Sequence, residues 1–242
     1  MKSQHWSFDH NVYNALPTLE DANSNLSKRK NSFERFVREA SDLLRATSLG
    51  NGELGAFLLH RHWTVEKGSM MVERPRVLES GRVALITASV EADSALESGV
   101  MPSRWCAPTV NRPVVPLEFS SDPFVLEVCK VLADQQPLLS DLAQMLQKHK
   151  LQKAIGYMVI PRQSLSSENF DDFVETNKDR ISIVTGERLS PLERVSRIRT
   201  GWPLSWSRIG SVWKCCYCSH GPGHTCKHRL PDPPICQPHG CV

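Results

Sequence analysis

Two histidines at the end of an apolar run are the first residues in this sequence that suggest chemistry. His60 and His62 are separated by one residue and are followed by Glu66, in the pattern His-x-His-x3-Glu. Two imidazoles and a carboxylate can bind iron, zinc or manganese facially, or can act as general acid and base. We therefore take His60, His62 and Glu66 as candidate catalytic or metal-binding residues. The alternative is that His60 is packed near a strand end while His62 lies at the surface.

The C-terminal tail carries a second set of metal-ligating residue types. It holds six cysteines and four histidines between residues 213 and 242, with few aliphatic residues to build a core. The spacing Cys215-x2-Cys218-x5-His224-x3-His228 has the ligand types and end spacings of a structural zinc site. The alternative ligands are Cys216, His220, Cys226, Cys236, His239 and Cys241. Thiolates and neutral imidazoles predict a closed, structural Zn²⁺ site, and a flexible tail that binds metal weakly is the alternative.

The residues that lead up to the histidine pair predict a central strand. Its first half is apolar on both faces, which is typical of a strand covered on both sides. Alternate side chains share a face, so His60 and His62 are expected on one face of an extended chain. The expected faces are Leu54, Ala56, Leu58, His60 and His62 on one side, and Phe57, Leu59, Arg61 and Trp63 on the other.

The rest of the chain predicts an α+β fold with a mixed, mostly antiparallel sheet of about five strands and three to four packed helices. The expected elements are helices at 31–49 and 122–150, further strands at 70–73, 82–90, 154–160 and 180–185, a short helix at 168–175 and a proline-rich connection at 91–121. Asn31 with Glu34 and Asp122 with Pro123 are typical helix starts. We expect an irregular leader (1–30), an α+β domain (31–208) and a Cys/His-rich tail (209–242).

Composition excludes several classes of protein and partner. The chain has 242 residues, 40% hydrophobic, and a formal net charge of +3, which argues for no particular polyanionic partner. Neither a signal-peptide pattern nor an apolar run of membrane-spanning length is visible, so we expect a cytoplasmic or nuclear location and no secretion. A reducing compartment favours metal binding over disulfides for the cysteines. No glycine-rich phosphate loop is present, so no nucleotide cofactor is expected.

Two resemblances follow from these motifs. The spacing of His60, His62 and Glu66 resembles the first motif of cupins, but the next histidine is His149 on a predicted helix, and the predicted helices do not fit a many-stranded all-β barrel. The stretch Leu-Leu-His-Arg-His at 58–62, with Met-Val-Glu at 71–73, resembles an uncharacterised group of fungal proteins over residues 30 to 208. That resemblance implies no activity.

Two functions are therefore expected. The first is an intracellular zinc-binding protein with an interaction or accessory role, whose tail binds a protein partner; nucleic acid is not expected as a partner. The second is a metal-dependent or acid/base enzyme that uses His60, His62 and Glu66 on a small metabolite. Its pocket would lie under the 91–121 connection and be lined by Trp63 and Trp105.

Overall fold

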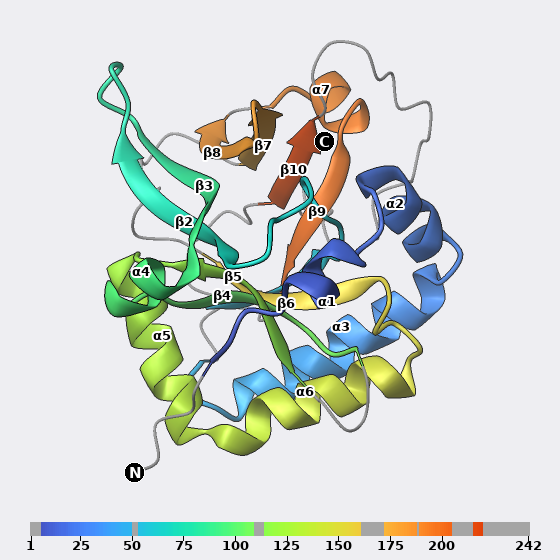
Figure 1. Ribbon diagram of the computed structural model, residues 1–242. Coiled ribbons are helices and arrows are strands. Elements are labelled where there is room, and N and C mark those ends of the chain that lie inside the picture. Colours follow the sequence, from blue (N-terminus) through green and yellow to red (C-terminus); the bar gives the residue numbers. More distant parts are fainter. Residues whose placement is uncertain are drawn as a thin grey trace.

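The structure is a computed structural model that describes residues 6–49, 53–108, 114–160, 172–187, 189–204 and 215–219. Within these ranges the chain forms seven helices and ten strands. Figure 1 shows the strands in the central and upper part of the molecule, with the longer helices below and to the right of them. The predicted α+β class and mostly antiparallel sheet are confirmed, but five strands and three to four helices were too few.

The ten strands form one closed barrel. They are β1 (Leu54–Leu58), β2 (Ser69–Val77), β3 (Val83–Glu91), β4 (Met101–Cys106), β5 (Val115–Ser120), β6 (Ile155–Val159), β7 (Asp172–Lys178), β8 (Ile181–Glu187), β9 (Ile198–Pro203) and β10 (Cys215–Ser219). Their order is β1-β6-β4-β5-β2-β3-β8-β7-β10-β9, and β9 pairs with β1 to close the barrel. The β2–β5 and β7–β10 pairs are parallel and the others are antiparallel. The described residues thus combine a many-stranded barrel with seven helices, so the fold is not an all-β barrel.

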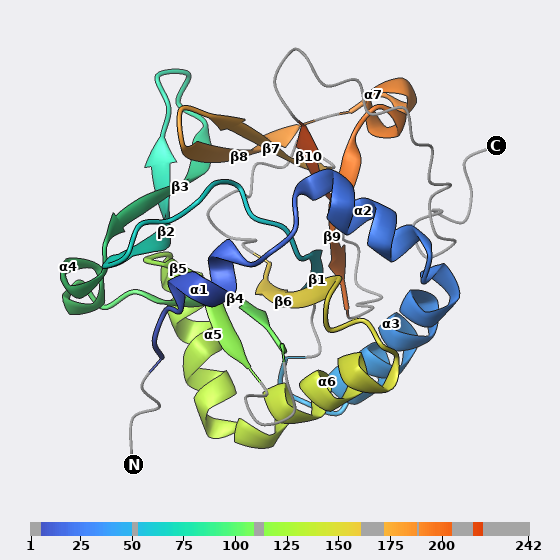
Figure 2. The ribbon, with the colours of Figure 1, turned by 45° about the vertical axis from the view of Figure 1, so that its right-hand side comes forward.

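The helices lie outside the barrel. They are α1 (His10–Asn14), α2 (Leu19–Ser27), α3 (Lys30–Arg45), α4 (Ala92–Glu97), α5 (Pro123–Asp134), α6 (Gln136–Lys148) and α7 (Pro191–Val195). Figures 1 and 2 both place α3, α5 and α6 along one side of the barrel. The carboxylate of Asp122 caps α5 by accepting from the N–H of Phe124, as predicted, whereas α3 begins at Lys30 without a side-chain cap. None of the helices described is long and apolar enough to cross a bilayer.

Apolar cores on both sides of the barrel wall explain why the strands are buried on both faces. The outer core joins the barrel wall to the helices and includes Leu54, Ala56 and Leu58 of β1. The inner core fills the barrel and includes Phe57, Leu59, Met71, Leu117 and Phe173. Each large apolar side chain buried in this way contributes about 1.5 to 3 kcal/mol. The two faces predicted for Leu54–Leu58 are therefore confirmed.

The connection predicted at 91–121 is not a loop. It contains α4, β4 and β5, and β4 and β5 pair with each other although each contains a proline. Proline is tolerated in a strand where its missing N–H is not needed. The register of β5 with β2 covers Phe119 and Ser120, so Pro116 lies outside that ladder. Pro102 adjoins a register shift in the β4–β5 pair. The described parts of 91–121 therefore belong to the barrel wall and do not form a loop over a pocket.

Three further expectations need correction. Residues 10–14 and 19–27 of the predicted irregular leader are helical, because Asp9 and Thr18 cap them and Tyr13 and Leu19 are buried. The helix expected at 168–175 is strand β7 from residue 172 onward, and the part before it lies outside the described residues. The predicted boundary after residue 208 also lies outside them, but residues 215–219 of the tail form β10 between β7 and β9.

Candidate metal centre

The histidine pair lies in a loop and not on a strand. β1 ends at Leu58, five residues before the end of the predicted strand. An unbroken strand would place His60 on the face of Leu58, toward the helices. Instead, the ring of His60 lines a cavity inside the barrel together with Phe57. Nδ1 of His60 is 2.7 Å from the carbonyl oxygen of Leu58, and this hydrogen bond fixes the ring orientation.

The N-terminal segment holds the histidine loop, residues 59–65, in place. The side chain of Asn14 donates to the carbonyl of Val65 and accepts from its N–H, both at 2.9 Å. Arg61 donates from its backbone to Pro17 at 3.0 Å and from its guanidinium to the carbonyl of Asn14 at 2.8 Å. The segment expected to be an irregular leader therefore positions the candidate site.

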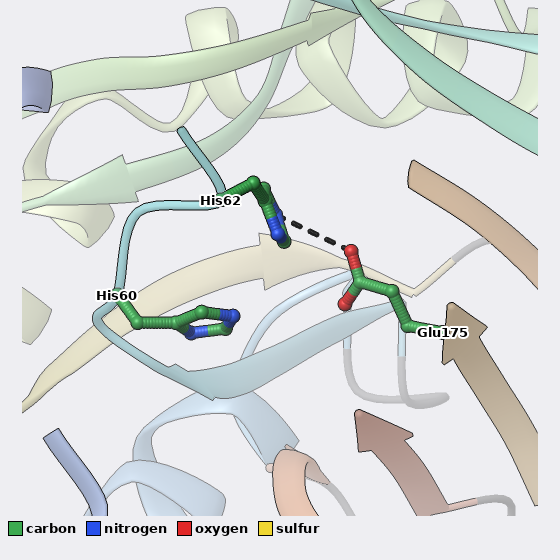
Figure 3. Close-up of side chains that lie close together, drawn as sticks. All are labelled: His60, His62 and Glu175. Atoms are coloured by element: carbon green, nitrogen blue, oxygen red, sulfur yellow. Dashed lines mark ion pairs between the residues drawn. The ribbon is translucent and has the colours of Figure 1, made fainter. Parts of the chain in front are cut away.

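Glu175 on β7 meets the two histidines inside the barrel. Phe173 and Glu175 both line the cavity, as alternate residues of one strand should. One ligand atom each from His60, His62 and Glu175 can be chosen so that all three lie within 4.8 Å of one another. Nε2 of His62 is 3.3 Å from Oε1 of Glu175, which also accepts a hydrogen bond from the Ser182 hydroxyl. Figure 3 shows Glu175 reaching toward both rings from the opposite side.

A second carboxylate, Glu118 on β5, is equally close to His62. Its Oε1 lies 3.3 Å from Nε2 of His62. Arg104 on β4 is directly opposite Glu118 in the strand pair, with register shifts on both sides of Arg104. Such bulges re-aim side chains. Nη1 of Arg104 donates to Oε1 of Glu118 at 3.3 Å, and Nε forms an ion pair with Oε2 at 3.2 Å.

His60 is held as a neutral ring with one free nitrogen lone pair. Burial, reinforced by the nearby His62, lowers the pKa of His60 to about 4. A carbonyl oxygen can only accept, so Nδ1 must carry the proton that the ring donates to Leu58. Nε2 therefore keeps its lone pair, and it has no hydrogen-bond partner among the described residues. This is the tautomer in which a histidine binds a metal through Nε2.

His62 lies between two carboxylates, Glu118 and Glu175. Burial alone would lower its pKa, but Glu175 and Glu118 outweigh that effect and raise the pKa of His62 above its ordinary value. Burial alone would likewise raise the pKa of Glu175, but His62, Arg104 and His60 lower it to about 2. Arg104 and His62 also hold the pKa of Glu118 below its ordinary value. The cluster therefore places His62 and Arg104 beside two carboxylates, Glu118 and Glu175.

The cavity beside this cluster is small and has both apolar and polar walls. Its volume is about 20 Å³, which is room for one water molecule or one ion. Leu85, Met158 and Val184 supply apolar walls, and Glu73 and Ser103 supply polar ones. The hydroxyl of Ser103 has no hydrogen-bond partner among the described residues. Two buried polar groups, this hydroxyl and the His60 ring, thus face one cavity.

The structure does not place Glu66 in the site. Its side chain is 79% exposed and lies 3.6 Å from Arg180, so Glu175 replaces it as the carboxylate beside the histidines. Trp105 is buried in the outer core, and Trp63 packs against the inner core without lining the cavity. His149 follows α6, and its Nε2 lies 3.1 Å from Glu39.

Most of the predicted zinc ligands of the tail lie outside the described residues. The backbone that carries Cys215, Cys216 and Cys218 forms β10. His220, His224, Cys226, His228, Cys236, His239 and Cys241 lie outside the described residues. Zinc binding by the tail therefore stays a prediction.

Four residues of the site were not predicted from the sequence: Glu73, Arg104, Glu118 and Glu175. Each is a charged residue within a strand and is at most 8% exposed. Glu73 ends the run Met-Met-Val-Glu, and Glu118 interrupts Val-Pro-Leu-Glu-Phe. Charged residues are seldom buried unless they are paired. An isolated carboxylate within an apolar strand was therefore the sequence feature that could have indicated these site residues.

Comparison with protein-family models, with curated proteins and with solved structures finds no match. The fungal grouping therefore stays a prediction, and the cupin spacing is not supported by a cupin-like partner for His60 and His62 at Glu66. A fold alone does not imply a function, which depends on the geometry and chemistry of the residues in the site.

Proposed function

We propose that this protein is a metal-dependent enzyme that holds its ion inside the barrel and acts on a small molecule. The observation that carries the proposal is the convergence of His60, His62 and Glu175 on one buried point, with ligand atoms within 4.8 Å of one another. Two histidines and one carboxylate form the ligand set of many mononuclear iron enzymes, and zinc and manganese accept the same ligand types.

The residues fit a transition-metal ion in both distance and chemistry. Ligands about 2.0 to 2.2 Å from an ion lie about 3 to 3.5 Å from one another, so the site would need to contract by roughly 1 Å. Side-chain rotation can supply a shift of this size. The supporting contacts are present, because Leu58 orients His60 and Ser182 orients Glu175. Imidazole ligands favour Fe²⁺, Zn²⁺ or Mn²⁺ over Ca²⁺ and Mg²⁺, which prefer oxygen ligands.

A purely structural charge network is the competing explanation. It accounts for His62 between two carboxylates, but it does not account for Nε2 of His60, which is buried without a hydrogen-bond partner among the described residues. Buried polar groups are normally satisfied, and buried charges cost several kcal/mol each. A ligand that accepts the His60 lone pair explains this unpartnered nitrogen.

The protein's own residues would provide the setting for catalysis. When bound, the ion would polarise a water molecule or a substrate oxygen. Burial raises the pKa of Glu73 to about 7, which suits a group that gives or takes a proton near neutral pH. Glu73 lines the same cavity as His60 and Glu175, and the apolar walls limit competing water.

Metal content of the purified full-length chain tests the proposal. We expect His60→Ala and Glu175→Gln each to lose one equivalent of metal per chain relative to the wild type. His149→Ala is the matched control, because His149 is also a buried histidine beside a glutamate. Metal content that is the same in all four proteins would reject the site. For the catalytic part, the metal-loaded protein should consume a compound from a mixture of small metabolites, followed by mass spectrometry, and Glu175→Gln should not.

A further inference from the structure

We propose that the Ser103 hydroxyl donates a hydrogen bond to a water-sized ligand atom on the metal and so helps to hold that ligand in the cavity. The ligand would be a small hydrogen-bond acceptor, such as hydroxide or a substrate oxygen, held by the ion at one point and by Ser103 at another. This proposal rests on the proposed metal site at His60, His62 and Glu175. It adds to that site a ligand-binding residue from β4.

Ser103 is the extra residue of a β-bulge in β4. Pro102 pairs with Phe119 of β5, and Arg104, two residues further on, pairs with Glu118. Two steps along β4 therefore match one step along β5. Adjacent side chains of a regular strand point to opposite faces, yet Ser103 and Arg104 both line the cavity inside the barrel. The bulge explains this arrangement, because an extra residue re-aims the side chains next to it.

The hydroxyl of Ser103 is buried without a hydrogen-bond partner. The residue is 3% exposed, and its Oγ forms no hydrogen bond with any of the described residues. Buried polar side chains nearly always have a partner, and a hydroxyl left without one costs free energy. A ligand in the cavity that accepts a hydrogen bond would remove this cost.

His60 presents a second unpartnered group to the same cavity. Its Nε2 keeps a lone pair and likewise forms no hydrogen bond with the described residues, so Ser103 does not donate to it. The space that both residues line is about 20 Å³, which is room for one water-sized guest. The two groups are therefore placed to bind a guest and not each other.

A metal ion that carries a bound oxygen satisfies both groups. The His60 lone pair needs a partner that accepts electrons, as a metal ion does, whereas the hydroxyl can donate its proton to an oxygen on that ion. Zinc in proteins is bound by Cys, His, Asp and Glu side chains, so we assign the neutral hydroxyl to the bound oxygen and not to the ion. The apolar walls of the cavity, Leu85, Met158 and Val184, have no side-chain donor to offer.

Fluoride binding to the cobalt-loaded full-length protein tests the proposal. Fluoride has nearly the size of hydroxide, binds metal ions and can only accept hydrogen bonds, and the visible absorption of Co²⁺ changes when a ligand is exchanged. We expect Ser103→Ala to contain as much Co²⁺ as the wild type and to bind fluoride about tenfold more weakly. Equal fluoride affinity in the two proteins, or no fluoride response in the cobalt-loaded wild type, would overturn the proposal. Loss of Co²⁺ from Ser103→Ala would also overturn it, because Ser103 would then be a metal ligand.

Thr87→Val is the matched control. Thr87 is also a buried residue of the barrel whose hydroxyl forms no hydrogen bond with the described residues, but it does not line the cavity. Valine has nearly the shape of threonine, so this variant removes a buried hydroxyl from another place. Its fluoride affinity should match that of the wild type. A tenfold loss in this control would overturn the assignment to Ser103.

Urea unfolding of the metal-free proteins separates ligand binding from a structural role. The Ser103 hydroxyl makes no bond that the metal-free protein could lose, so Ser103→Ala should be at least as stable as the wild type without metal. A marked loss of stability, or failure to fold, would show that the hydroxyl supports the barrel and would overturn the proposal. Failure of the metal site itself is distinguishable, because wild-type protein would then bind no Co²⁺ that depends on His60 and Glu175, and both proposals would fall.

Discussion

Glu73 is a buried carboxyl group whose ionisation opposes folding. Burial raises its pKa from 4.5 to about 7, although the nearby Arg104 offsets part of this rise. The folded state therefore favours the protonated form, so its contribution to stability is full below about pH 4.5 and is lost as the pH rises toward 7. A pKa difference of this size between the folded and unfolded states corresponds to about 3 kcal/mol of folding free energy.

Replacing Glu73 with glutamine should remove this dependence. Glu73→Gln cannot ionise. We therefore expect its free energy of unfolding, relative to that of the wild type, to rise by about 3 kcal/mol between pH 4.5 and pH 8. Urea unfolding at both pH values measures the change, with the exposed Glu97→Gln as control. Parallel stability profiles for wild type and Glu73→Gln would show that burial does not hold this proton.

Gly156 on β6 is required by the close packing of three elements. A Cβ atom at this position would lie 2.3 Å from the carbonyl oxygen of Trp105, a backbone atom, and 2.5 Å from the Phe57 ring. Because a backbone atom cannot move aside easily, we expect Gly156→Ala to destabilise the fold by about 1 to 3 kcal/mol or more. Urea unfolding measures this. Gly68→Ala is the comparison, since nothing lies within 4 Å there and only its positive φ adds a cost.

The link between α1 and the histidine loop predicts an effect on metal binding at a distance. Asn14 both donates to and accepts from the backbone of Val65. Asn14→Asp keeps the acceptor but loses the donor, so the loop that carries His60 and His62 should become less ordered. We expect Zn²⁺ affinity to fall by about tenfold, in the range seen when groups that orient metal ligands are lost. Isothermal titration measures it, with Asn11→Asp on the same helix as control.

The elements show which parts of this structure a sequence pattern can predict. Local signals sufficed where they were strong: Asp122 with Pro123 began α5, and the alternation in 54–58 gave both faces of β1. They failed where a long-range contact decides the outcome. Pro116 appeared to break a strand, and its position outside the β2 ladder is not visible in sequence. The sequence could not predict that Glu175 meets His60. The two residues are over a hundred positions apart, and only the closure of the barrel brings them together.

At the scale of the whole molecule, the closed barrel is what brings the site together. The cluster is built from four elements. The loop after β1 supplies the two histidines, and β4, β5 and β7 supply Arg104, Glu118 and Glu175. The inner core surrounds these polar groups with apolar side chains, and α3, α5 and α6 cover one side of the wall. Charges placed in such surroundings interact strongly, which is why the pKa values of His60 and Glu175 depart so far from their ordinary values.

The barrel and the tail should depend on different metal ions. The barrel has extensive apolar cores, whereas the sequence after residue 219 has few aliphatic residues and many cysteines and histidines. With so little apolar surface, burial at about 25 cal/mol per Å² cannot offset an ordering cost of about 1 to 2 kcal/mol per residue. A metal-bound tail would gain the missing stability from its ligands.

Two full-length variants separate the two parts. His224→Ala/His228→Ala should lose one equivalent of zinc and be cleaved faster by protease after Arg208, while the thermal midpoint of the barrel stays within about 2 °C of the wild type. His60→Ala should do the reverse, because it loses the barrel metal and leaves the tail as resistant as before. Loss of cooperative unfolding in His224→Ala/His228→Ala would contradict this division, since it would show that the tail's metal supports the barrel.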